Sequence, residues 1–450
     1  MKKQNNKMEL LGNAPVTKAL LAMGIPTMIG MLINALYNLA DAYFVSGLGA
    51  VPMAAISIVY PLGQIVVGIG LLFGNGAASY ISRLLGQNNR KAANAVACTA
   101  LYSSLTVGIV FILISIIFLK PILVLLGATD TILPYAMLYG RIYIISCVCN
   151  VYNVTMNNLV TSEGAAKITM GALLMGAVLN ICLDPVFIYN FGLGIAGAAI
   201  ATAISQLVST SVYVIYFMRK KSIFELKRKN CCFSKNVFSE IFKIGIPTLI
   251  FQLLTSVSIS LINNAAGHYS DAAIAGMGVV SRLISMGTLA VFGFIKGFQP
   301  IAGYSYGAKN MNRLREAIKV SIAWSTLFCV CLGFIFIIFS STIIVTFSSG
   351  DAEMVALASR SLKANGITVM LFGFYTVYSS LFLALGKGKE GFFLGACRQG
   401  FCFIPVIIVL PMLWGIDGIL FAQPIADVLS AIISAVMAVS LHKQLSIENI

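Results

Sequence analysis

The sequence is poor in charged residues and poorest in acidic ones. Only 10% of its 450 residues are charged, with 15 Asp and Glu against 30 Lys and Arg, whereas 59% are hydrophobic. Soluble domains carry about 25% charged residues, so this composition excludes an ordinary soluble protein and indicates a membrane protein. Basic residues on the cytoplasmic side of membrane spans then explain the net charge of +15, and no nucleic-acid partner is expected.

The chain also lacks the patterns of metal and nucleotide chemistry. It has two histidines, His268 and His442, and its ten cysteines mostly lie in apolar stretches without metal-ligand spacing. It contains no GxxxxGK[ST] loop, so nucleotide hydrolysis within this chain is not expected. These absences argue against a membrane-embedded enzyme, and no cofactor is predicted. Residues 1–15 lack the apolar core of a signal peptide, so the first span is expected to be retained.

Long apolar stretches recur along the whole chain and predict an all-α integral membrane protein with twelve transmembrane helices. The loops on one side are rich in Lys and Arg, whereas the loops on the other side contain Lys120 as their one basic residue. This bias predicts that both termini are cytoplasmic. The predicted spans are residues 16–44, 52–82, 92–125, 131–161, 167–190, 195–218, 238–266, 272–303, 313–346, 353–384, 390–414 and 417–440.

The two halves of the chain repeat each other. The sequence GIPT at 24–27 returns at 245–248, and Gly86, Gly194 and Gly197 also return 221 residues later, as Gly307, Gly415 and Gly418. Six helices per half make the two repeats parallel, which favours two lobes around a central cleft and alternating access over a channel. The predicted units are an N-terminal lobe (1–218), a basic cytoplasmic linker that is flexible or lies on lipid headgroups (219–236), and a C-terminal lobe (237–450).

The first span carries a carboxylate on a polar stripe. Asn34, Tyr37, Asn38 and Asp41 follow one helix face at i, i+3, i+4 and i+7. Such a stripe must face protein or a water-filled cavity, because lipid offers no polar partners. A charge at the bilayer centre costs at least ~2.5–3.5 kcal/mol, so Asp41 is a candidate functional residue. For the two asparagines, and for Gln206 in the sixth span, a structural contact between helices is the alternative.

A second carboxylate lies in the fifth span. Asn180 and Asp184 share one helix face, and Pro185 predicts a kink directly after them. An amide and a carboxylate beside a kink form a candidate proton or cation site, because burial disfavours the charged form of a carboxylate and lets it exchange protons near neutral pH. The sixth span adds Thr202 and Gln206, again at i and i+4.

The second half does not repeat these acidic residues and instead carries basic ones inside its spans. Arg282, Lys296 and Arg398 are candidate residues of a cavity in the C-terminal lobe, together with Asp427. The basic residues are predicted either to pair with Asp427 or with backbone carbonyls, or to bind an anionic part of a substrate.

Several segments, each of modest specificity, together carry a family resemblance: YNLADAYFVSGLG at 37–49, SRLLGQNNRKA at 82–92, LNICLDPVFIYNFGLGIAGAAIAT at 179–202, GFIKGFQPIAGYSYGAKN at 293–310, and ALGKG, CRQGFCFIPVIIVLP and AQPIAD further on. With these segments the chain resembles the multidrug and toxic-compound extrusion (MATE) family of the MOP superfamily. The resemblance is to its bacterial DinF/MepA-like branch and covers nearly the whole chain.

The resemblance implies export of cationic and aromatic organic compounds by a monomer in the bacterial inner (plasma) membrane. Alternating access would couple this export to antiport of H⁺ or Na⁺. Lys296 departs from the pattern, since similar sequences often have a neutral Gln there. An added cation is expected either to repel cationic substrates or to alter the conformational equilibrium. The implied coupling and substrate residues are Asp41, Asp184, Asn180, Thr202, Tyr37 and Asn38, with a candidate Na⁺ site at Asp41, Asn180, Asp184 and Thr202.

One alternative stays open, a flippase or exporter of a lipid-linked or anionic precursor with the same fold. It requires Arg398, Lys296 and Arg282 to converge on the cavity. A drug exporter would instead present an aromatic cavity with accessible carboxylates.

Overall fold

The computed structural model describes residues 2–267, 269–346 and 352–447. In these residues the chain folds into helices, and none of them forms a strand. Eleven helical segments of the described chain are long and apolar enough to cross a membrane. A twelfth, α6 (Leu133–Ser162), has 30 residues and is also a predicted span. The predicted all-α membrane fold is confirmed.

The N-terminal half begins with a short helix and continues with six long helical units. The third unit is followed by the short helix α5, and the fifth ends in a π-helical turn because Pro185 interrupts its hydrogen bonds. Its elements are α1 (Lys2–Gly12), α2 (Val16–Ser46), α3 (Ala50–Gly86), α4 (Arg90–Ile117), α5 (Leu119–Leu125), α6, α7 (Ala166–Pro185), the π-helix Val186–Asn190 and α8 (Gly194–Met218).

The C-terminal half repeats this order, with one difference that affects the site. Its fifth unit is broken earlier, by a π-helix at Cys397–Phe401. Its elements are α9 (Lys235–Gly267), α10 (Asp271–Gly307), α11 (Met311–Ile338), α12 (Ser340–Val345), α13 (Ala352–Ala384), α14 (Gly388–Ala396), α15 (Phe403–Trp414) and α16 (Ile416–Ile447), with a 3₁₀ turn, Arg228–Asn230, in the linker before α9.

The repeat extends to local geometry. Asn89 and Asn310 directly precede α4 and α11 as their N-cap residues. Each side-chain oxygen accepts a hydrogen bond from a backbone N–H three residues on, at 3.1 and 3.0 Å. The residues before them, Asn88 and Lys309, have φ values of 57° and 56°. Left-handed backbone is uncommon in residues other than glycine, so its occurrence at equivalent positions shows that both halves use the same turn.

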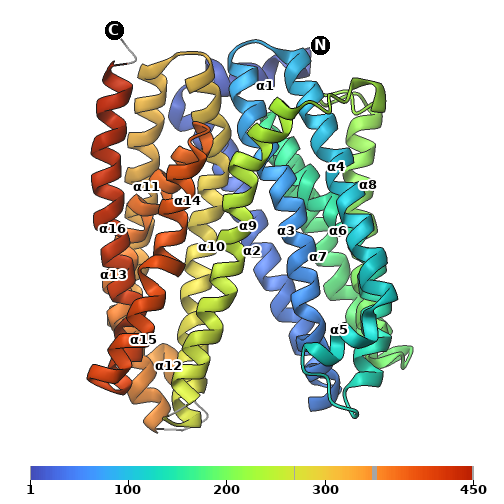
Figure 1. Ribbon diagram of the computed structural model, residues 1–450, viewed down its shortest axis with the longest axis vertical. Coiled ribbons are helices and arrows are strands. Elements are labelled where there is room, and N and C mark those ends of the chain that lie inside the picture. The colour runs from blue at the N-terminus through green and yellow to red at the C-terminus, as the bar shows by residue number, and fades with distance from the viewer. Residues whose placement is uncertain (1, 268, 347–351, 448–450) are drawn as a thin grey trace.

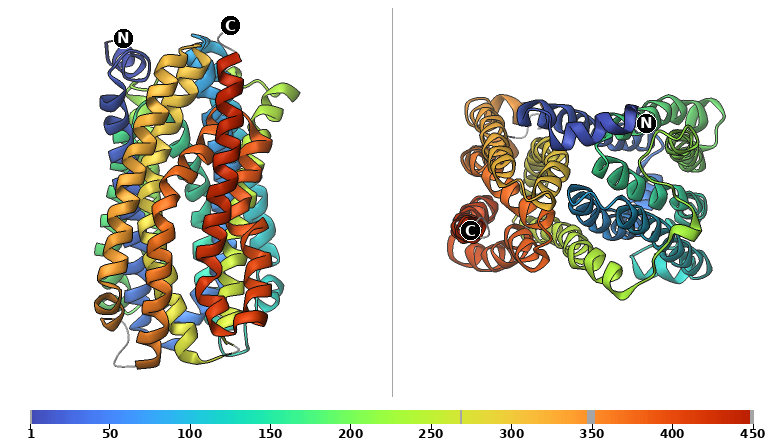
Figure 2. Two further views of the ribbon diagram at one scale, coloured as in Figure 1. Left: turned by 90° about the vertical axis from the view of Figure 1, so that its left-hand side faces the viewer. Right: turned by 90° about the horizontal axis from the view of Figure 1, so that it is seen from above.

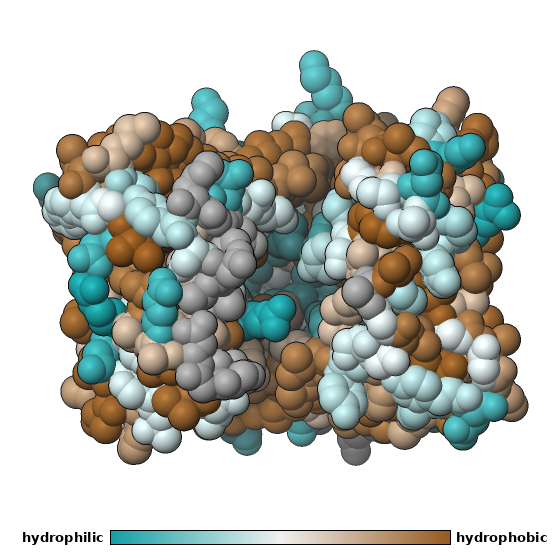
Figure 3. Space-filling view, turned by 90° about the horizontal axis from the view of Figure 1, so that it is seen from below, coloured by the Kyte–Doolittle hydropathy of each residue, from teal (hydrophilic) through white to brown (hydrophobic). Residues whose placement is uncertain are grey.

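The two halves stand side by side as two lobes. In Figure 1 the N-terminal helices lie on the right and the C-terminal helices on the left, with both termini at the top. The view from above in Figure 2 also shows the two groups of helices side by side. The lobes diverge away from the termini, and the surface seen from below is hollowed between them (Figure 3).

Glycines allow the lobes to approach closely near the end that carries the termini. A Cβ on Gly297 of α10 would lie 2.4 Å from the backbone nitrogen of Gly24 on α2. A Cβ on Gly86 of α3 would lie 2.2 Å from the carbonyl oxygen of Tyr304 on α10. Any larger residue would push the helices apart, so these glycines close this end of the molecule.

Polar contacts reinforce the closed end. Arg83 of α3 forms an ion pair of 2.7 Å with Glu240 of α9. Arg313 of α11 donates to backbone oxygens at the end of α1, including that of Leu11 at 3.1 Å. Cations at a helix C-terminus satisfy its free carbonyl groups, so Arg313 fastens α1 to the C-terminal lobe.

The linker 219–236, for which the sequence predicts flexibility or lipid contact, is held against the N-terminal lobe. Asn94 on α4 accepts a hydrogen bond of 2.7 Å from the backbone N–H of Glu225. The backbone N–H of Cys232 donates to the hydroxyl of Thr99, also on α4, at 3.0 Å. The fully buried Glu163 accepts from Ser222 and from the backbone N–H of Ile223.

Candidate functional site

A buried polar cluster lies inside the N-terminal lobe, between α7 and α8. The Asn180 amide donates to Asp184 Oδ1 at 3.3 Å and to Thr202 Oγ1 at 3.4 Å. Asn180 and Asp184 are fully buried and Thr202 is 4% exposed. The structure thus brings together three of the four residues of the candidate Na⁺ site that the family resemblance implies.

The local sequence explains where this carboxylate lies. Asp184 is followed by Pro185, which ends the regular hydrogen bonding of α7 and leads into the π-helical turn. Asn180 lies one turn earlier on the same face, so both side chains point toward α8.

Asp41 and Tyr37 approach this cluster from α2. Tyr37 lies beside Thr202, and Asp41 is close enough to Asp184 for their charges to interact. Asp41 is partly exposed, unlike Asp184. The two carboxylates therefore share one region of the lobe but differ in solvent access.

Two oxygens in the cluster have no hydrogen-bond partner within the described part of the chain. Asn180 Oδ1 and Asp184 Oδ2 are buried and accept no hydrogen bond from the described residues. Unpaired buried oxygens are costly, and hard cations such as Na⁺ prefer oxygen ligands. The donor set thus fits either a proton on Asp184 or a small cation held by Asn180, Asp184 and Thr202.

Other polar residues of these spans make structural contacts. Asn38 is exposed and donates to the backbone oxygen of Asn34 at 2.8 Å. Gln206 Oε1 accepts from the Asn153 amide at 2.8 Å and so links α8 to α6. Gln206 thus makes a structural contact between helices, whereas the hydrogen bond of Asn38 stays within α2.

A cavity of about 500 Å³ lies between the lobes, mostly against the C-terminal one. This size suits a drug-sized molecule. Helices α9, α10 and α13 supply most of its wall, and α2, α3 and α6 contribute Met31, Leu71, Asn75 and Asn158. None of the described residues that line it is Asp or Glu, so Asp41 and Asp184 lie outside it.

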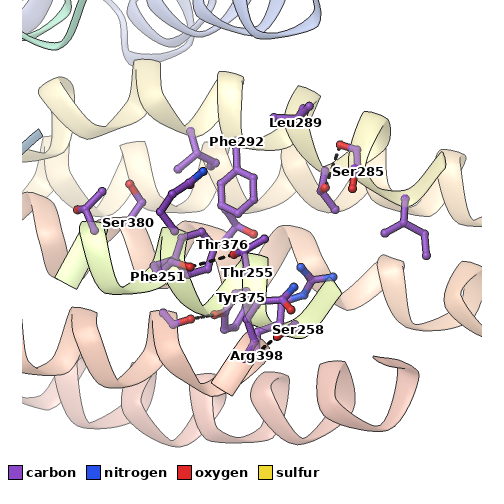
Figure 4. Close-up of a pocket in the computed structure, with 18 of the residues that line it drawn as sticks. Phe251, Thr255, Ser258, Ser285, Leu289, Phe292, Tyr375, Thr376, Ser380 and Arg398 are labelled. Atoms are coloured by element: carbon purple, nitrogen blue, oxygen red, sulfur yellow. Dashed lines mark hydrogen bonds between the residues drawn. The ribbon is translucent and has the colours of Figure 1, made fainter. Parts of the chain in front are cut away.

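Aromatic side chains form one side of the cavity. The ring of Phe292 contacts those of Phe251 and Phe372 edge-on, with centroids 6.0 and 5.4 Å away. Tyr375 continues the group and donates its hydroxyl proton to the backbone oxygen of Leu394 at 2.7 Å. Figure 4 shows Phe251, Phe292 and Tyr375 at the cavity together with hydroxyl residues such as Ser285 and Thr376.

Arg398 lines the cavity but is neutralised by Asp427. Its Nε lies 2.8 Å from Asp427 Oδ1, and Nη2 lies 3.3 Å from Oδ2. Gln423 donates to the same carboxylate at 2.7 Å, and the guanidinium lies 4.6 Å above the ring of Phe372. The predicted pairing of Arg398 with Asp427 is found, and Asp427 lies behind the arginine rather than on the cavity wall.

Lys296 also lines the cavity, but its partner is neutral. Its Nζ donates to Asn157 Oδ1 on α6 of the opposite lobe. Among the described residues, no carboxylate lies within ion-pair distance of this ammonium group. Lys296 is thus the uncompensated charge among the cavity residues that the structure describes.

The expectation that Arg282 belongs to the cavity is wrong. Its neighbour Ser281 lines the cavity, whereas the Arg282 side chain is exposed and points away. One residue along a helix rotates the side chain by about 100°, which moves it to another face. Two of the three basic residues that the anionic alternative requires therefore reach the cavity.

Sequence reasoning missed two residues beside Lys296. Gln299 lies one turn further along α10, lines the same cavity, and has a buried Nε2 without a hydrogen-bond partner among the described residues. Asn157, which accepts from Lys296, comes from α6 of the other lobe. Neither gives a signal in the sequence, because both roles depend on how the helices pack.

Two repeated six-helix lobes, a closed end and a central cavity form the architecture of a membrane transporter. The pattern of the MatE family matches residues 26–186 and 247–409, once in each half. The chain belongs to the MatE family.

Bacterial multidrug exporters are similar to this chain over nearly their whole length. The multidrug export protein MepA of Staphylococcus aureus (strain NCTC 8325 / PS 47) is 31% identical over 438 residues, which cover 97% of this chain and 96% of that protein. MepA of Staphylococcus saprophyticus is 31% identical over 436 residues, 96% of each chain.

Solved structures of transporters share the fold. An outward-facing multidrug resistance MATE transporter of the MOP superfamily superposes with a TM-score of 0.90 at 25% identity, covering 97% of this chain and 98% of that one. A MOP superfamily transporter from Pyrococcus furiosus, described as having a binding pocket of reverse polarity, also gives 0.90 at 25% identity, covering 98% of each chain.

Proposed function

We propose that this protein exports organic compounds with aromatic surface across the bacterial inner membrane, in antiport with H⁺ or Na⁺. The main support is that Asn180 and Asp184 are buried inside one lobe and outside the central cavity. Each also has one oxygen that accepts no hydrogen bond from the described residues. Coupling requires only that ion and substrate favour different states of the lobes, and an ion site outside the substrate cavity allows this.

The proposed transport cycle follows from which end of the molecule is closed and which is open. With both termini in the cytoplasm, the cavity opens to the outside. Binding of the coupling ion at Asp184 and Asp41 neutralises the carboxylates and changes how α2 packs, with Pro26 on that helix as the point that bends. Substrate leaves outward, the lobes rock, and the ion is released inside. One chain holds both lobes, so a monomer is sufficient.

The membrane potential can drive the coupling ion inward. Moving one positive charge inward is favoured by about 2.3 kcal/mol per 100 mV of membrane potential. The substrate class expected from the sequence, organic cations, stays a prediction. The aromatic wall of Phe251, Phe292 and Tyr375 supports aromatic substrates of either charge.

Reconstituted vesicles test the coupling. Uptake of ethidium and of naphthalene-2-sulfonate would be followed while pH and sodium gradients are imposed independently. We expect uptake of at least one compound to follow one gradient in the wild type and to lose that dependence in Asp184→Asn. The matched control is Asp130→Asn, an exposed carboxylate in the loop after α5.

Two results would contradict the proposal. One is uptake that Asp184→Asn and Asp130→Asn affect equally. The other is a folded wild-type protein that moves neither compound under either gradient.

A further inference from the structure

The charge balance of the cavity is positive. Arg398 is cancelled by Asp427, whereas the ammonium group of Lys296 faces a neutral amide oxygen. A charged group within a membrane is costly and is normally paired or functional. The charge of Lys296, which has no carboxylate partner among the described residues, is therefore expected to have a function.

The contact that Lys296 makes between the lobes does not explain why its side chain is charged. At the position equivalent to Lys296 in the first repeat lies Asn75, which also lines the cavity and donates to Thr248 of the opposite lobe at 2.9 Å. A neutral amide thus makes the same kind of contact across the lobes. The positive charge at Lys296 is not required for it.

A second unpaired donor lies beside the lysine. The buried Nε2 of Gln299 has no acceptor among the described residues, and the spacing of three residues puts Gln299 and Lys296 on the same face of α10. The ammonium group of a cavity residue and a buried amide donor one turn away on the same helix face are together complementary to an oxyanion. A cation in this place would meet repulsion and no acceptor charge.

We infer that the cavity recognises an aromatic organic anion, whose acidic group binds between Lys296 and Gln299 while its rings pack against Phe251 and Phe292. This inference rests on the proposed export function and defines its substrate class. The two phenylalanines contact each other edge-on at 6.0 Å, so they offer a fixed apolar surface for a planar ring.

The volume and lining fit such a ligand. A cavity of about 500 Å³ holds a molecule of one to three rings with its acidic group. Hydroxyl groups of Thr255, Ser285 and Thr376, drawn in Figure 4, add neutral hydrogen-bonding partners without preference for charge. The selection for an anion therefore depends on Lys296.

The test is equilibrium dialysis of two compounds with the same ring system and opposite fixed charges, naphthalene-2-sulfonate and 2-naphthyltrimethylammonium. Full-length protein in an uncharged detergent is compared with Lys296→Gln, Lys296→Arg and Arg282→Gln. We expect the wild type to bind the sulfonate more tightly than the ammonium compound. Lys296→Gln should weaken sulfonate binding about tenfold or more, since it removes a desolvated charge partner.

The control variants separate charge from folding. Lys296→Arg keeps the charge and should retain most sulfonate binding, and Arg282→Gln, outside the cavity, should leave it unchanged. The inference is overturned if the wild type prefers the ammonium compound, if it binds neither, or if Lys296→Gln weakens both equally.

A competition experiment with lipids identifies which kind of molecule carries the acidic group. Displacement of the sulfonate by phosphatidylglycerol but not by phosphatidylcholine would assign the site to an anionic lipid headgroup, and no displacement by either would assign it to a soluble acid. Both outcomes support an anion site. The binding test needs no ion gradient, so its failure leaves the coupling proposal standing, and failure of coupled uptake leaves the anion site standing.

Discussion

The two lobes share one helical frame but place different charges at equivalent positions. Thr202 and Gln206 of α8 correspond to Gln423 and Asp427 of α16, and Asn75 of α3 corresponds to Lys296 of α10. In the N-terminal lobe the carboxylate of Asp184 has an amide neighbour and an unpaired oxygen. In the C-terminal lobe the carboxylate of Asp427 is bound by an arginine. A buried carboxylate is thus held in an ion pair in one lobe and keeps an oxygen without a partner among the described residues in the other, where we propose that it binds the coupling ion.

The largest difference should appear in stability. Asp427→Asn leaves the buried Arg398 without its counter-charge, so we expect a loss of about 3–5 kcal/mol, seen as a lower midpoint of thermal unfolding in detergent. Asp184→Asn breaks no ion pair and should leave the midpoint nearly unchanged. Equal losses in both variants would remove the distinction between the two carboxylates.

A smaller effect is expected where the lobes touch. In Gly297→Val the new side chain would collide with the backbone of Gly24, and we expect a cost of about 1–3 kcal/mol in thermal stability. Gly278→Val on the same helix is the matched control, because a Cβ there meets no atom within 4 Å. If both variants lose the same stability, the close approach of α2 and α10 does not hold the closed end.

The smallest effect concerns the partner of Lys296. Asn157→Ala removes the acceptor that binds the ammonium group and frees it for a ligand, so naphthalene-2-sulfonate should bind a few-fold more tightly, in line with about 1 kcal/mol for one hydrogen bond. Asn153→Ala on the same helix, which bonds Gln206 instead, should leave the affinity unchanged in equilibrium dialysis. Weaker binding in Asn157→Ala would show that Asn157 itself holds the ligand.

The sequence predicted what depends on spacing along one helix. The i, i+4 spacing of Asn180 and Asp184 predicted that both side chains lie on one helix face, as found. The offset of 221 residues between matching segments also predicted the two repeated halves. The pairing of Arg398 with Asp427 followed from the cost of an isolated charge in a membrane. The helix ends also lay close to the predicted spans, because apolar length sets them.

What the sequence could not predict depends on how helices rotate and pack. Arg282 was assigned to the cavity although its neighbour Ser281 is the residue that lines it. The contact of Lys296 with Asn157 joins residues of different lobes, and the free amide of Gln299 is defined by the absence of a partner among the described residues. No local pattern encodes either feature.

We propose that ion and substrate bind in separate places, the ion near Asp184 and the substrate at Lys296. The most direct test is naphthalene-2-sulfonate affinity in detergent, measured as a function of pH and of Na⁺ concentration. We predict that the coupling ion lowers the affinity in the wild type and in Asp130→Asn, whereas Asp184→Asn binds the sulfonate but no longer responds to the ion. An unchanged ion response in Asp184→Asn would contradict the account.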